Sequence, residues 1–150
     1  MVGRPTPGRC SGVFDRILLA VDGSEHSHRA VAATAELAAT GKTEVLVLHL
    51  QELGVAGRAG PIPLEERSEA ADLVNTVADE LRSAGVTVHG AAHAVLTRDV
   101  APEIISSAKD FDAGLIVMGT RGMSDFAALL IGSVAHKVIH HAHCPVLVTR

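Results

Sequence analysis

Three glycines and a serine make up the part of this sequence best suited to bind a ligand. Gly119 and Gly122 are followed, after nine intervening residues, by Gly132 and Ser133. The segment comes directly after the apolar run at residues 115–118, which is typical of a strand. Glycine has no Cβ, so its backbone can approach an anion closely, and the first N–H groups of a helix lack partners within that helix. The pattern therefore predicts a loop that binds phosphate.

The elements around this segment are predicted to form a parallel sheet. Apolar runs typical of strands buried on both faces lie at residues 16–21, 44–50, 86–89 (with a possible continuation to 96), 115–118 and 145–149. Helices are expected over about 24–40, with Ser24 or Ser27 as N-cap, and over about 64–83, 99–108 and 132–141. Residues 54–63 are expected to form a loop. This alternation predicts an α/β fold with an open, doubly wound, Rossmann-like sheet of five parallel strands in a single domain.

We expect the ligand where the first and fourth strands end, because open parallel sheets bind ligands beyond the carboxyl ends of their strands, where the strand order reverses. Asp22 follows the first strand and Gly119 the fourth. In the expected strand order, 3-2-1-4-5, the two lie side by side. Asp22 then offers a carboxylate to Mg²⁺ on a phosphate. Arg121 offers a guanidinium to the phosphate, and Ser133 adds a hydroxyl at a helix start, where anions are favoured.

Composition and missing motifs exclude other classes of protein. The chain has 150 residues, a net charge of −4 and 2% aromatic residues, which argues against nucleic acid as a partner. Neither a dinucleotide fingerprint after the first strand nor a P-loop is present. Two cysteines cannot define a disulfide framework, and no apolar stretch is long enough to suggest a membrane partner. We expect a cytoplasmic protein with a flexible leader at residues 1–12 and one domain at 13–150.

The chain resembles the universal stress protein family from about residue 14 to its end. The segments that carry the resemblance are residues 17–24, 45–49, 116–119 with the following loop, and 144–148. The loop fits in full the family's nucleotide-binding pattern, in which two glycines separated by two residues are followed, nine residues later, by Gly-Ser or Gly-Thr. The resemblance implies the ATP-binding subgroup, a fold like that of the adenine nucleotide alpha hydrolases, and a homodimer formed through the last strand, Val146–Thr149.

The resemblance also implies roles for individual residues. Asp22 would lie near the ribose or hold a metal on the phosphates, and Leu50, at the end of the second strand, would contact adenine through its backbone. The glycines and Ser133 would hold the phosphates and ribose. The full candidate set for binding the nucleotide is Asp22, Leu50, Met118, Gly119, Arg121, Gly122, Gly132, Ser133 and Val134. The chain departs from the family at Thr97-Arg98, where members often carry a glycine.

We expect a nucleotide-dependent regulator rather than a turnover enzyme, because no residue is evidently placed as a nucleophile or to orient a water. Three alternatives stay open: a weak ATPase or self-phosphorylating protein, a protein that binds cyclic AMP, and a structural dimer without ligand. His136 and His140, four residues apart with His141 and His143 close by, raise the further alternative of a metal site. Cys144 is expected to be a small buried apolar residue rather than a reactive thiol.

Overall fold

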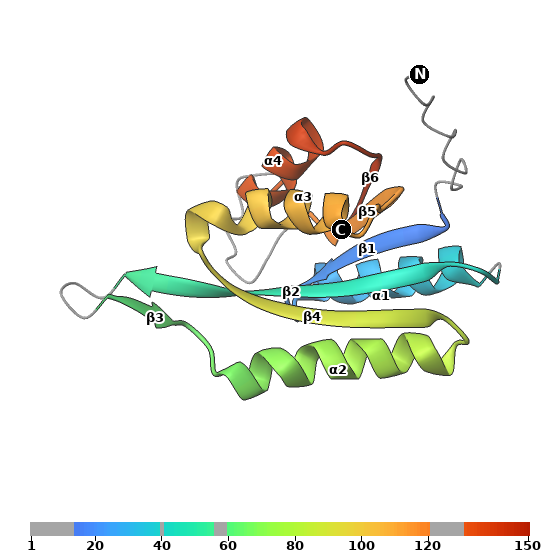
Figure 1. Cartoon of the computed structure of the whole chain (residues 1–150), viewed down its shortest axis with the longest axis horizontal. Helices are drawn as coiled ribbons and strands as arrows, with labels where there is room; N and C mark the ends of the chain where they lie inside the picture. The colour runs from blue at the N-terminus through green and yellow to red at the C-terminus, as the bar shows by residue number, and fades with distance from the viewer. Residues whose placement is uncertain (1–13, 40, 56–59, 121–130) are drawn as a thin grey trace, which may run out of the picture.

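The computed structural model describes residues 14–39, 41–55, 60–120 and 131–150, and within them a sheet lies between two layers of helices (Figure 1). Helices α1 and α2 pack on one face of the sheet, and α3 and α4 on the other. The elements, in chain order, are β1 (Arg16–Val21), α1 (Glu25–Ala38), β2 (Glu44–Val55), β3 (Pro61–Pro63), α2 (Arg67–Ser83), β4 (Thr87–Leu96), the short 3₁₀ helix η2 (Thr97–Asp99), α3 (Val100–Asp110), β5 (Leu115–Gly119), α4 (Ser133–His141) and β6 (Val146–Thr149).

The central strands β1 and β5 are apolar along most of their length because helices cover both faces of the sheet there. In β1, Ile17 and Leu19 face α1 and α2, whereas Leu18 faces α3 and α4, and all three are fully buried. The same alternation runs along β5, where Val117 faces α1 and Ile116 faces the other layer. Side chains of successive strand residues point to opposite faces, so a central strand needs apolar residues at every position.

The predicted parallel sheet is confirmed. Strand β1 pairs in parallel with β2 and with β5, β2 pairs in parallel with β4, and β5 pairs in parallel with β6. These five strands thus follow the order β4-β2-β1-β5-β6, which is the expected 3-2-1-4-5 with β4, β5 and β6 as the third, fourth and fifth parallel strands. The order reverses between β1 and β5, so the carboxyl ends of these two strands flank the expected ligand position.

The prediction of five strands was wrong in one respect, because residues 54–63 are not simply a loop. Strand β2 continues to Val55, and β3 pairs with its end in an antiparallel manner, so the sheet has six strands. Leu53 pairs with Pro63 of β3 on one side and with Leu96 of β4 on the other. Strand β3 therefore lies on the same edge of β2 as β1, which pairs with the earlier residues of β2. The glycines and prolines of this segment favoured a loop over residues 54–63, so the end of β2 and the short strand β3 were not predicted.

The helix starts refine the expectations from sequence. Ser24, not Ser27, is the N-cap of α1, and its hydroxyl accepts a hydrogen bond from the Ser27 amide. Helix α2 begins at Arg67 rather than near residue 64, because Glu66 and Glu69 form a capping box. Asp99 precedes α3 as expected, although its side chain makes no capping hydrogen bond. Among the described residues, no helix is long and apolar enough to cross a lipid bilayer.

Candidate functional site

The carboxyl ends of β1, β5 and β6 meet at one level of the sheet. Leu19 pairs with Val117, so Val21 and Gly119, two residues farther along, lie at the same level on neighbouring strands. Gly119 in turn pairs with Thr149 of β6. The chain leaves the sheet after Val21 and after Gly119, and the two segments that depart there are the ones predicted to hold the ligand.

Asp22 shapes the first of these two segments. Its Oδ1 accepts a hydrogen bond from the Ser24 amide at 2.9 Å, and its own amide donates to the Ser27 hydroxyl at 3.2 Å. The Ser27 amide donates to the Ser24 hydroxyl, also at 3.2 Å. Asp22 is half-buried, and within the described part of the chain no hydrogen bond engages its Oδ2. One carboxylate oxygen therefore holds the turn, and the other is available for a ligand.

Gly119 is required for close packing between β5 and α1. A Cβ on Gly119 would lie 2.8 Å from the Cβ of His26, 3.0 Å from the His26 carbonyl carbon and 3.2 Å from the Ser27 amide nitrogen. Cβ atoms essentially never come within 3.0 Å of another heavy atom, so the 2.8 Å contact would force a shift, and the two backbone contacts leave little room for it. The first glycine of the pattern thus lets the first turn of α1 approach the end of β5, a role that the sequence pattern alone does not reveal.

The base of the glycine segment is closed by backbone hydrogen bonds. The Thr120 amide donates to the Thr149 carbonyl at 2.7 Å, and the Gly132 amide donates to the Thr120 carbonyl at 2.6 Å. The start and the end of the segment therefore lie next to each other at the carboxyl edge of β5. Arg121 and Gly122 lie outside the described residues.

Gly132 and Ser133 open helix α4. Gly132 is the N-cap and its carbonyl accepts from the His136 amide at 3.0 Å, so Ser133 and Val134 are the first two residues of the helix. The first N–H groups of a helix have no partner within it, and the helix dipole favours an anion there. Ser133 is exposed and Val134 is half-buried. These residues stand at the carboxyl edge with their amides suited to phosphate.

Leu50 and Met118 are the apolar members of the candidate set. Met118 is 6% exposed and belongs to the core beneath α3 and α4, against which the half-buried Leu50 also packs. Leu50 lies within β2 and not at its end, because β2 runs on to Val55. The adjoining β2 and β4 therefore extend past the end of β1 and form a wall beside the site (Figure 1).

Arg98 lies in η2, directly after the end of β4. Its Nε lies 3.7 Å from Oδ2 of Asp99, and its side chain is 79% exposed. The residues that replace the family's frequent glycine thus form the 3₁₀ helix η2, and Arg98 is turned to solvent beside a carboxylate. A shallow hollow of about 610 Å³ over residues 63–69 lies at the start of α2, on the opposite face of the sheet from α3 and α4.

A His-Glu pair next to the site, with a buried histidine and a half-buried glutamate, was missed in the sequence. His49 of β2 is 5% exposed, and its Nδ1 donates to the Val21 carbonyl at 2.8 Å. Its Nε2 pairs with Oε1 of Glu65, whose backbone carbonyl accepts from the Gln51 side chain at 2.6 Å. The signal was a histidine inside the apolar run at residues 45–50.

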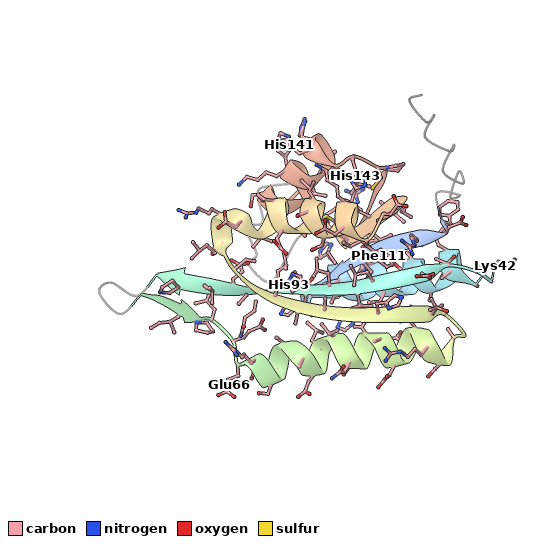
Figure 2. The ribbon with its side chains drawn as sticks, viewed as in Figure 1. Lys42, Glu66, His93, Phe111, His141 and His143 are labelled. Carbon is pink, nitrogen blue, oxygen red and sulfur yellow. The ribbon has the colours of Figure 1, made fainter. Side chains whose placement is uncertain are left out.

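The histidines of α4 do not assemble into a metal centre. The rings of His136 and His140 have centroids 4.4 Å apart, and those of His140 and His141 are 6.5 Å apart. No group of three or more His, Cys, Asp or Glu side chains in the described ranges is arranged to hold a metal ion. Figure 2 shows His141 and His143 at the end of α4 farthest from α2.

Cys144 is a partly buried thiol packed against the core beneath α3 and α4. Burial raises the pKa of this thiol, and a smaller opposing effect comes from a backbone hydrogen bond with Ile116. Raising the pKa lowers the fraction of thiolate, which is the reactive form, at neutral pH. Cys144 is thus partly rather than fully buried, and its raised pKa fits the expectation that it is not a reactive thiol.

We expect Cys144 to be alkylated slowly at pH 7 and faster as the pH rises beyond the ordinary thiol range. The measurement is the iodoacetamide rate followed by mass spectrometry in a Cys10→Ser variant, which leaves Cys144 as the only thiol. The same variant unfolded in urea is the control and should react several times faster at pH 7. Equal rates in the folded and unfolded chains would contradict the protected thiol.

Comparison with known proteins decides the family. The sequence model of the universal stress protein family matches residues 14–150. The chain belongs to this family. It is 37% identical over 150 residues to the "universal stress protein in QAH/OAS sulfhydrylase 3'region" of Thermus aquaticus, with 92% of this chain and 100% of that protein covered. It is 29% identical over 151 residues to universal stress protein YxiE of Bacillus subtilis, with the same coverage of both proteins.

Solved structures of universal stress proteins share the fold. The universal stress protein from Archaeoglobus fulgidus in complex with dAMP is 26% identical and superposes with a TM-score of 0.70, covering 93% of this chain and 100% of that one. A universal stress protein in complex with cAMP is 20% identical with a TM-score of 0.66, covering 90% of this chain and 95% of that one. At that identity the second likeness shows the fold alone.

Proposed function

We propose that this universal stress protein binds ATP at the carboxyl edge between β1 and β5 and acts as a nucleotide-dependent regulator in the cytoplasm. The observation that carries the proposal is the convergence of Asp22, Gly119 and the Gly132-Ser133 start of α4 at the point where the strand order reverses. Parallel sheets bind ligands at such points, and helix starts favour phosphate. The related protein from Archaeoglobus fulgidus in complex with dAMP supports an adenine nucleotide as the ligand class.

The residues present fit a magnesium nucleotide. Asp22 would be the protein ligand, since Oδ1 is held by the Ser24 amide and Oδ2 has no hydrogen bond among the described residues. Mg²⁺ usually keeps several waters and takes one or two carboxylates together with phosphate oxygens, so it does not need the cluster of ligands that the described residues lack. When bound, the ion would neutralise phosphate charge.

Self-association through β6 is part of the proposal. Strand β6 pairs with β5 on one side and, in the part of the chain that the structure describes, has no partner strand on its other edge. Leu147 of this strand is 37% exposed. A second copy of β6 across a two-fold axis would pair that edge and cover the leucine.

The direct test is binding of nucleotide to the purified protein. We expect adenine nucleotide to co-purify, as detected by mass spectrometry, and ATP to bind in calorimetry. Absence of both, up to millimolar ATP, would refute the proposal. If cyclic AMP displaces bound ATP at a lower concentration than ATP itself needs to bind, the proposed ligand becomes cyclic AMP. If incubation with labelled ATP leaves labelled phosphate on the protein, and Ser133→Ala abolishes this label, the protein phosphorylates itself.

We expect Gly122→Val to weaken ATP binding by at least about tenfold, or ~1.4 kcal/mol, while the fold is retained. A β-branched side chain crowds an approaching phosphate and does not take positive φ cheaply. Ala127→Val, which adds bulk in the same segment outside the glycine pattern, is the matched control and should bind normally. Calorimetry gives the affinities and circular dichroism checks the fold. Unchanged affinity in Gly122→Val would show that the glycine pattern does not hold the ligand.

A further inference from the structure

Thr149, the next-to-last residue of the chain, joins the two segments that leave the sheet at the candidate site. Its carbonyl accepts the Thr120 amide at 2.7 Å, where the glycine segment begins. Its hydroxyl donates to the His26 carbonyl at 2.8 Å, in the first turn of α1. Thr149 is therefore hydrogen-bonded to both segments, although it is 123 residues away from His26 in the chain.

A second contact closes this junction. The Thr120 hydroxyl and His26 Nδ1 are hydrogen-bonded at 3.1 Å, so His26, Thr120 and Thr149 each bond to the other two. Thr120 is 4% exposed, and the packing of Gly119 on His26 lies directly beside it. Thr120 is thus buried, whereas His26 and Thr149 are half-buried, so the junction is only partly exposed to water.

The junction fixes the distance between the two halves of the site. His26 follows the Asp22–Ser24 turn by two residues, and Ser27 bonds both the Asp22 amide and the Ser24 hydroxyl. On the other side, the Thr120 carbonyl accepts the Gly132 amide at the start of α4. A shift of the first turn of α1 away from β6 would therefore move the Asp22 turn relative to Gly132.

We propose that Thr149 is a positioning residue for the nucleotide site: it holds the Asp22 turn and the glycine segment at the spacing that the ligand requires. The inference rests on the proposed function. It also means that the edge strand β6 is physically connected to both ligand segments, so changes at this edge are transmitted to the site. Thr149 itself does not need to touch the ligand.

The expected loss of ATP affinity depends on the fraction of molecules in which the two segments are correctly spaced to bind ATP. A net intramolecular hydrogen bond changes an equilibrium by about fivefold. If loss of the Thr149 hydroxyl leaves the two segments correctly spaced in about one-fifth of the molecules, the apparent dissociation constant for ATP rises about fivefold. The carbonyl bond to Thr120 stays in place, so the sheet is preserved.

The experiment compares Thr149→Val with Thr149→Ser by calorimetry with Mg²⁺-ATP. Valine keeps the shape and the strand propensity but lacks the hydroxyl, whereas serine keeps the hydroxyl. We expect binding about fivefold weaker for valine and close to wild type for serine. Thr87→Val, an exposed threonine at the start of β4, is the matched control and should not change affinity. Sedimentation of each sample checks that all variants have the same oligomeric state.

Hydrogen exchange supplies a readout independent of nucleotide. The Ser27 and His28 amides, which are hydrogen-bonded to Ser24, should exchange faster in Thr149→Val than in Thr149→Ser or the wild type. If the wild-type protein binds ATP but valine and serine variants bind it equally well, the positioning role is refuted while the proposed function stands. If the wild type binds no nucleotide, the proposed function itself fails.

Discussion

Gly119→Ala is expected to destabilise the protein by about 2 kcal/mol, within the 1–3 kcal/mol typical of overpacking. The backbone of Gly119 is not left-handed, so alanine is conformationally acceptable there, and the cost comes from contact alone. The new Cβ would meet the His26 Cβ at 2.8 Å and backbone atoms of His26 and Ser27 at 3.0 and 3.2 Å. The first turn of α1 cannot move easily, because Thr120 and Thr149 both bond to His26. Thermal unfolding should show a midpoint lowered by about 4–8 °C.

Gly54→Ala is a matched control for this prediction. A Cβ on Gly54 would also lie 2.8 Å from another atom, but that atom is Cδ2 of Leu64, whose residue is 70% exposed. The end of an exposed leucine can rotate away, so we expect a stability change below about 1 kcal/mol. Equal midpoints for the Gly119 and Gly54 variants would show that α1 yields to the added methyl group and that the close approach is not required.

His49→Leu is expected to cost about 2–3 kcal/mol. Leucine fills a similar volume, but it leaves the Val21 carbonyl without its donor and the Glu65 carboxylate without its partner. Breaking a buried pair by removing one member costs more than the pair contributes as a whole, because the remaining charge is desolvated and unpaired. The Glu65 side chain is 30% exposed, which places the expected cost below the range for fully buried pairs. Urea unfolding followed by circular dichroism measures it.

Two further variants test whether the His49–Glu65 pair contributes more to stability than a pair at the protein surface. The double variant His49→Leu with Glu65→Leu should regain part of the lost stability, because no unpaired carboxylate remains. His89→Leu removes the partner of Glu44 in a pair at 3.3 Å whose histidine side chain is 54% exposed, and should cost less than about 1 kcal/mol. A His49→Leu cost as small as that of His89→Leu would argue against the buried pair.

The elements and their order could largely be read from the sequence. Continuous apolar runs such as residues 16–21 and 115–118 have the composition of strands covered on both faces, and the segments between them have helical spacing and caps. The register between β1 and β2 and the extension of β2 to Val55 were not predicted from the sequence. The reason is that the β2 extension is stabilised by its pairing with β3 and β4 and not by local preference.

The sequence by itself determined the fold class and the family resemblance and predicted the position of the candidate site, because continuous apolar runs and the spacing of Gly119, Gly132 and Ser133 are local properties of the chain. Only the tertiary structure decided what surrounds that site. Gly119 packs against His26, and Thr149 bonds to both Thr120 and His26, through contacts between segments about 30 to 120 residues apart. Such contacts depend on how the strands line up and on which helix turn approaches which strand end, and no local pattern encodes that alignment.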